Sequence, residues 1–104
     1  MQRKNYTRPL TADDRIHVSF SKHRGVILTF SVNYAARIDG RWREIFRVDN
    51  CHGTPHIHRY YLRRKQFKLS LSDSNNQAFT LAYTYVVTNF QAIRENYLRV
   101  RPRT

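Results

Sequence analysis

The densest group of reactive side chains is a cluster of histidines near the middle of the chain. Three of the five histidines, His52, His56 and His58, fall within seven positions. His56 and His58 are two positions apart, so in a strand both side chains lie on the same side. Gly53 and Pro55 favour a tight loop that brings His52 close to them. Imidazoles titrate near neutral pH, so such a cluster suits proton transfer or metal binding.

Metal-independent cleavage of RNA is the first chemistry that this cluster suggests. One imidazole removes the 2′-hydroxyl proton, a second protonates the leaving oxygen, and a cation stabilises the phosphorane. Arg47 and Arg59 are the candidate cations, Tyr60 can donate a hydrogen bond, and no cofactor is expected. The candidate catalytic residues are therefore His52, His56, His58, Arg47, Arg59 and Tyr60.

Two other interpretations of the cluster remain open. Histidines at positions i and i+2 of a strand are an accepted ligand pair, so His52, His56 and His58 are alternative metal ligands, completed by Asp49 or Cys51. The spacing matches no standard zinc finger. In a structural interpretation, the histidines bond the loop backbone and face solvent or phosphate. A two-metal nuclease is disfavoured because the acidic residues are few and scattered.

Positive charge dominates the composition and indicates a polyanionic partner. Lysine and arginine number 19 against 7 aspartates and glutamates, which gives a formal net charge of +12. Arginine accounts for 15 of the 19 cations, and its planar guanidinium pairs bidentately with phosphate and stacks on bases. Self-repulsion of this size destabilises a small fold unless a polyanion lies nearby. We expect RNA as the partner, with DNA as the alternative.

A basic and aromatic segment after the histidines is the expected nucleic-acid surface, since bases can stack there while cations neutralise phosphates. A second interpretation has equal weight: the aromatic residues belong to the core and the cations line a solvated edge of the sheet. Alternation also places Arg43, Ile45 and Arg47 together on the outward side of the preceding strand. The candidate nucleic-acid-binding residues are Arg43, Arg63, Arg64, Lys65 and Lys68.

Alternating apolar residues predict the antiparallel sheet that must position these groups. The clearest alternation runs over 26–38, with Val26 and Leu28 on the buried side and Ile27 out of pattern. Other strands are expected at about 16–21, 41–49, 56–62 and 68–71.

The Asp39-Gly40 pair predicts a hairpin turn. A three-residue loop ending in Gly40 places Val32 opposite Phe46, with every large apolar residue on one face. A two-residue loop would place Arg47 opposite Val32, which the alternation of faces disfavours. We therefore predict a type I turn followed by a glycine bulge.

A change of hydrophobic period predicts one long helix from about 75 to 98, and Ser74 with Gln77 has capping-box spacing. Its apolar stripe consists of Phe79, Ala82, Val86, Phe90, Ile93 and Tyr97. The expected fold class is α+β, an antiparallel sheet of four or five strands followed by one long C-terminal amphipathic helix packed on one sheet face. We expect residues 1–12 to form a flexible basic arm, and 13–104 a single domain with a basic C-terminal tail.

The lone cysteine, Cys51, excludes an intramolecular disulfide and suits a reducing compartment. Neither a signal-length apolar segment nor a run of about 18 apolar residues is present. We therefore expect a cytoplasmic protein with no membrane contact. The sequence leaves the oligomeric state open, a homodimer included.

Three short segments resemble those of small prokaryotic toxins of the TumE-like family. They are the Asp39-Gly40 turn, Arg47-x-Asp49-Asn50 and Pro55-His56-x-His58, all within residues 28–62. The chain departs from that pattern in its short spacer and in its helix, which carries no specific motif. The resemblance implies the toxin of a toxin–antitoxin pair that acts on RNA, with an antitoxin as protein partner.

These features together predict an RNA-directed, metal-independent ribonuclease of toxin–antitoxin type. The first alternative is a non-enzymatic domain that binds RNA or DNA. The second is a regulator that binds an acidic protein partner through the same basic face.

Overall fold

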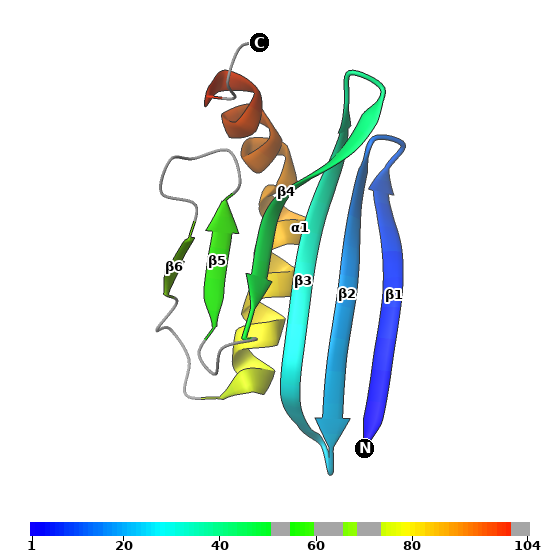
Figure 1. The fold of residues 1–104 in the computed structure, drawn as a ribbon, viewed down its shortest axis with the longest axis vertical. Helices are drawn as coiled ribbons and strands as arrows, with labels where there is room; N and C mark the ends of the chain where they lie inside the picture. Colours follow the sequence, from blue (N-terminus) through cyan, green and yellow to red (C-terminus); the bar gives the residue numbers. More distant parts are fainter. Residues whose placement is uncertain (51–54, 60–65, 69–73, 101–104) are drawn as a thin grey trace.

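The chain folds into one antiparallel sheet with a long helix across it (Figure 1). The computed structural model describes residues 1–50, 55–59, 66–68 and 74–100. Within these residues six strands follow one another in chain order, each antiparallel to the one before. The elements are β1 (Gln2–Thr11), β2 (Asp14–His23), β3 (Val26–Ile38), β4 (Arg41–Asp49), β5 (His56–Arg59), β6 (Gln66–Lys68) and α1 (Asn75–Val100). The α+β class, with the C-terminal helix on one sheet face, is confirmed.

The N-terminal segment is a strand, which corrects the expectation of a flexible arm over residues 1–12. β1 pairs with β2 from Gln2 to Thr11, with one irregularity after Pro9. Most of its side chains are exposed because it lies at the sheet edge, so the apolar alternation of a half-buried strand is missing. Leu10 is the exception in this strand, since it is partly buried and packs against the core. The sheet therefore has six described strands rather than four or five.

The β3–β4 hairpin has a two-residue loop, so the prediction of a three-residue loop is wrong. Ile38 pairs with Arg41 directly across the turn. Asp39 and Gly40 have φ angles of 54° and 78°, the pair of positive values that a type I′ turn requires. Glycine adopts this conformation without strain, and aspartate tolerates it better than most residues.

A β-bulge at Ile45 makes this short loop compatible with an apolar core. Tyr34 pairs with Phe46 whereas Ala35 pairs with Glu44, so Ile45 is the extra residue of β4. The bulge turns both Ile45 and Phe46 into the core, where their exposures are 0% and 2%. The prediction that Ile45 faces outward is therefore wrong.

The bulge also changes which residues face each other along the hairpin. Val32 lies opposite Val48 rather than Phe46 or Arg47, so the objection to a two-residue loop no longer applies. Closer to the turn, Arg43 pairs with Ala36, a buried residue beneath the helix. Because cross-strand partners share a face, Arg43 and Arg47 lie on opposite faces of the sheet. The prediction that Arg43 and Arg47 share a face of the sheet is wrong.

A second irregularity reverses the expected faces at the start of β3. Ile27 is buried, whereas Val26 and Leu28 are exposed. The register between β2 and β3 shifts beyond the Ser21–Thr29 pair, which leaves Leu28 as the extra residue. The alternation therefore changes phase there.

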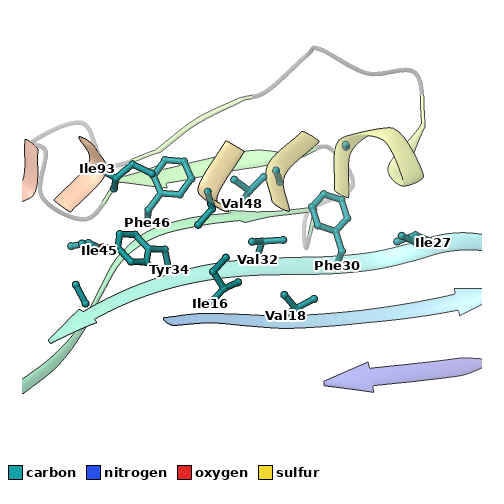
Figure 2. Close-up of a cluster of buried hydrophobic side chains, with 14 of the residues drawn as sticks. Ile16, Val18, Ile27, Phe30, Val32, Tyr34, Ile45, Phe46, Val48 and Ile93 are labelled. Atoms are coloured by element: carbon teal, nitrogen blue, oxygen red, sulfur yellow. The ribbon is translucent and has the colours of Figure 1, made fainter. Parts of the chain in front are cut away.

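The core lies between α1 and the inward side chains of β2, β3 and β4, as Figure 2 shows. The helix follows Ser74, whose Oγ accepts a hydrogen bond from the Gln77 N–H at 3.1 Å, as the capping-box spacing predicted. The predicted stripe is confirmed, since each of its members is buried or packs against the core: Phe79, Ala82, Val86, Phe90, Ile93 and Tyr97. No helix in the described part of the chain is long and apolar enough to cross a membrane.

The side of the sheet opposite α1 is covered by no described helix or strand, and we call it the open face. Strand register places one row of polar side chains across it from β1 to β5. The row consists of Thr7, His17, Asn33, Arg47 and His58. These side chains alternate along each strand with the buried ones, so the open face is the polar side of a half-buried sheet.

Candidate active site on the open sheet face

β4 and β5 bring two of the candidate histidines beside Arg47 and Asp49. The register pairs Arg47 with His58 and Asp49 with His56. Cross-strand partners share a face, and Arg47 also pairs with Asn33 of the open-face row, so all four side chains belong to the open face. The prediction that His56 and His58 lie on the same side of a strand is confirmed.

Asp49 is a buried carboxylate at the centre of this group. It is 3% exposed, and its Oδ2 lies 2.8 Å from Arg47 Nε and 3.2 Å from His58 Nε2. A carboxylate is seldom buried without such partners, because removal from water disfavours the charge. The side chains of Arg47 and His58 are 32% and 17% exposed. Asp49 therefore holds two side chains that still reach the surface.

The position of His58 suits a proton acceptor. Its Nε2 faces the carboxylate, so in the neutral tautomer that carries its proton on Nε2 the basic nitrogen is Nδ1. A carboxylate that fixes the orientation of a histidine recurs in general-base catalysis. His56 lies two residues away on the same face, about 7 Å along the strand. That spacing leaves room for one phosphate group between the two imidazoles.

Arg59 does not share the face of these histidines. It pairs with Phe46, whose side chain lies in the core beneath α1. There it lines an apolar groove of about 590 Å³ between α1 and strands β4 and β5, together with Val48 and Tyr85. Of the two arginines predicted to stabilise a phosphorane, the structure places Arg47 on the open face and Arg59 on the other.

Several predicted site residues lie outside the described part of the chain. They are Cys51, His52, Tyr60, Arg63, Arg64 and Lys65. Lys68 is in β6, where its backbone pairs with His56. Among the residues that the structure does describe, no three His, Cys, Asp or Glu side chains gather closely enough to hold a metal ion.

Asn50 has a positioning role that the sequence analysis did not assign. Its Oδ1 accepts a hydrogen bond from the Phe30 N–H at 2.8 Å, and its Nδ2 donates to the Leu28 carbonyl at 3.0 Å. The buried amide thus extends the pairing between β3 and the chain after β4, which holds the neighbouring Asp49 in place. An amide directly after an apolar strand was the available signal.

A second group on the open face, near the β3–β4 turn, was also missed. Arg15 Cζ lies 4.0 Å and Arg37 Cζ 5.6 Å from the centre of the Trp42 ring, within the range of cation–π contacts. Arg37 pairs with Trp42 across the hairpin, so the correct turn would have revealed that contact. Arg15 comes from β2, so its contact depends on the register of three strands.

On the helix-covered face, Asp14 forms a buried network with α1. Tyr34 Oη and Thr11 Oγ1 donate to its carboxylate oxygens, and Arg94 Nη1 donates to Oδ2 at 2.8 Å. Asp14 and Tyr34 are both fully buried. Burial, and after it the hydrogen bond to Asp14, raises the pKa of Tyr34 well above its usual range. This network ties α1 to β2 and β3.

Comparison with known proteins adds a family and no activity. One family model, described as "Domain of unknown function (DUF7718)", matches residues 1–102. Neither the curated proteins nor the solved structures include a significant match.

Proposed function

We propose that this chain, which belongs to the DUF7718 family, a domain of unknown function, is an RNA-directed ribonuclease of toxin type. The observation that carries the proposal is the group formed by His58, the buried Asp49 and Arg47, with His56 beside it. A net charge of +12 supports a polyanionic substrate. RNA carries the 2′-hydroxyl nucleophile that DNA lacks.

In the proposed reaction His58 acts as general base. Its Nδ1 removes the proton of the 2′-hydroxyl group, and the 2′-oxygen attacks the adjacent phosphorus. The bond from phosphorus to the 5′-oxygen breaks, and His56 protonates that oxygen. The products are a 2′,3′-cyclic phosphate and a 5′-hydroxyl, so no water and no oxidant is consumed. Asp49 keeps His58 oriented and stabilises the imidazolium that forms.

Arg47 supplies the cation in this scheme. A guanidinium carries five N–H donors, and the contact with Asp49 is made through Nε. We assign the donors on its terminal nitrogens to the phosphate oxygens, where a fixed cation stabilises the charge that develops in the transition state. Arg59, on the helix-covered face, has no role in it.

The substitution His58→Ala tests the assignment of the base. Loss of a general base typically lowers a rate by ~10²–10⁴-fold, so cleavage of single-stranded RNA should fall by that factor. RNA binding, measured by fluorescence anisotropy, should stay unchanged. His23→Ala is the matched control, because this exposed histidine ends β2 away from the site.

The wild-type protein provides the complementary test. Its rate should follow a bell-shaped pH profile, as a base and an acid acting together require, and should persist in EDTA. Loss of activity in EDTA with recovery on adding zinc would support the metal site instead. A protein that binds RNA and leaves it uncut across the neutral pH range would overturn the proposal.

Nucleic-acid binding without catalysis is the second candidate, and the cluster of Arg15, Arg37 and Trp42 favours it. An open sheet face with cations and an aromatic ring is a surface on which single-stranded bases stack. A surface that neutralises ~6 phosphates should lose ~10³-fold in affinity between about 50 and 200 mM salt. Affinity for RNA that does not change with salt would point to an acidic protein partner.

The toxin assignment adds an antitoxin to the proposal. It rests on the resemblance of Arg47-x-Asp49-Asn50 and Pro55-His56-x-His58 to TumE-like toxins. A neighbouring gene for a small helix-turn-helix protein whose product binds this chain and blocks cleavage would support it. A ribonuclease that is harmless when expressed in cells without such a neighbour would contradict it.

A further inference from the structure

The open face contains a polar pocket of about 340 Å³ beside the candidate active site. Its lining residues come from β1, β2, β3 and β4 and include Thr7, Arg15, His17, Asn33, Trp42 and Glu44. The volume is within the range of small-ligand sites. This pocket combines one aromatic ring with charged and amide groups, as a site for a flat, polar ligand does.

One wall of the pocket is a stack of planar groups. The guanidinium of Arg15 lies 4.0 Å from the centre of the Trp42 ring, and Trp42 is still 37% exposed. Ala35, another lining residue, has only a methyl group between β2 and β4, which leaves room for the indole there. Nucleobases stack on aromatic rings and on arginine planes, so this wall suits a base.

Asn33, one of the lining residues, carries a hydrogen-bond acceptor with no partner among the described residues. Asn33 Oδ1 is buried and makes no hydrogen bond with any described group. Leaving such an oxygen unsatisfied destabilises a fold by about 1–3 kcal/mol, which favours a ligand that donates to it. Glu44 adds an exposed carboxylate, a second acceptor. His17 is held by Thr7, with 2.8 Å between Nδ1 and Oγ1.

We propose that this pocket binds a guanine base of the RNA substrate, stacked against Trp42 and Arg15 and recognised by Asn33 and Glu44. Guanine is the base that presents two adjacent donors, N1–H and the N2 amino group, on its Watson–Crick edge. Both acceptors of the pocket match that edge. The inference rests on the proposed function, because it names the nucleotide that the ribonuclease selects.

The pocket lies at a distance that suits this role. Asn33 pairs with Arg47, which pairs with His58, so Asn33 is two strand spacings, about 10 Å, from His58, the proposed general base. An RNA strand whose phosphate lies at the histidines therefore has a neighbouring base within reach of Asn33 and of the pocket that Asn33 lines.

Trp42 also provides the assay, because it is the only tryptophan of the chain. We expect GMP to quench Trp42 fluorescence at concentrations at least ~5-fold lower than AMP, CMP or UMP, as hydrogen-bonded base discrimination predicts. Glu44→Gln and Asn33→Val should each reduce the affinity for GMP to that for AMP. Glu95→Gln, on the exposed side of α1, is the matched control and should leave it unchanged.

The stability of Asn33→Val separates a binding role from a structural one. The variant removes a buried acceptor without a described partner, so its free energy of unfolding should be no lower than that of the wild type. A clear loss of stability would show that Asn33 serves the fold.

The outcomes for the pocket are distinct from those for cleavage. Equal quenching by the four nucleotides would overturn the guanine assignment, and no quenching at millimolar concentration would overturn the base site altogether. His58→Ala should bind GMP like the wild type. If the protein prefers GMP and cuts no RNA, the guanine site is supported and the ribonuclease proposal is wrong.

Discussion

Two buried aspartates, Asp14 and Asp49, lie on opposite faces of one sheet and serve different ends. Asp14 receives hydrogen bonds from Tyr34 and from Arg94 of α1, so its partners join the helix to the strands. Asp49 contacts His58 and a partly exposed arginine of its own strand, so its partners reach the surface. A carboxylate satisfied by groups that cross the core stabilises the fold. One that holds a titratable imidazole at an open surface is placed for chemistry.

The largest effect should separate the two aspartates by activity. In Asp49→Asn the imidazole of His58 loses the carboxylate that orients it, and such a loss lowers rates by up to ~10⁴-fold. RNA cleavage should fall at least ~10²-fold, measured under single-turnover conditions. Asp39→Asn is the matched control, because asparagine tolerates the positive φ of the turn equally well. Full activity in Asp49→Asn would remove the distinction between the two aspartates.

The free energy of unfolding should separate the two aspartates in the opposite sense, with the larger loss at Asp14. In Asp14→Asn the buried network loses its negative charge, and one of the two acceptor oxygens that serve Tyr34 and Arg94 is replaced by an amide donor. Breaking such a group destabilises a protein by about 3 kcal/mol when one partner is partly exposed. Urea denaturation followed by circular dichroism measures the loss. Cleavage per folded molecule should match the wild type, and a fall in that rate would place Asp14 in the active site too.

Local pattern was enough to predict the helix and most strands, and not enough to predict the faces. The stripe of α1 and the Ser74 cap are local features, so both followed from spacing. The bulge at Ile45 is an irregularity of pairing with no signature of its own in the sequence. Because one extra residue inverts every later face, it separated Arg43 from Arg47.

The candidate site could likewise be predicted only where it depends on local spacing. His56 and His58 are neighbours in sequence, so their shared face could be inferred from the two-residue period of a strand. The network of Asp14 joins residues 20 and 80 positions apart, through Tyr34 and Arg94, and no local pattern connects them. β1 escaped prediction because an exposed edge strand buries too little apolar surface to alternate.

Alkaline pH should weaken the network around Asp14. Burial raises the pKa of Tyr34 in the folded state, so above about pH 10 the unfolded chain releases this proton while the folded one keeps it. The contribution is therefore intact below that pH and is lost as pH rises, by ~1.4 kcal/mol per pH unit. Tyr34→Phe should reduce this slope in the free energy of unfolding, and the raised pKa of Tyr6 should leave a smaller one. Tyr85→Phe, at an exposed position, should retain it.

The smallest effect concerns uncharged hydrogen bonds that attach the N-terminal end of α1 to the sheet. Asn76 Oδ1 accepts from the Ile27 N–H at 2.8 Å, and its Nδ2 donates to the Gly25 carbonyl at 2.9 Å. Two neutral, partly exposed hydrogen bonds are worth about 1 kcal/mol together, less than the charged network around Asp14. Asn76→Ala should lower the free energy of unfolding by that amount and leave RNA cleavage unchanged.

Asn96→Ala is the matched control for this comparison, because it makes the same change at an exposed position of α1. Alanine favours the helix at both positions, and Asn96 loses only an exposed hydrogen bond from Arg99, so the difference between the two variants mainly measures the attachment to the β2–β3 turn. Urea denaturation at neutral and at alkaline pH completes the test. The difference should not depend on pH, since no group of the attachment titrates. Equal stabilities would mean that the hydrogen bonds of Asn76 do not stabilise the attachment of α1 to the sheet.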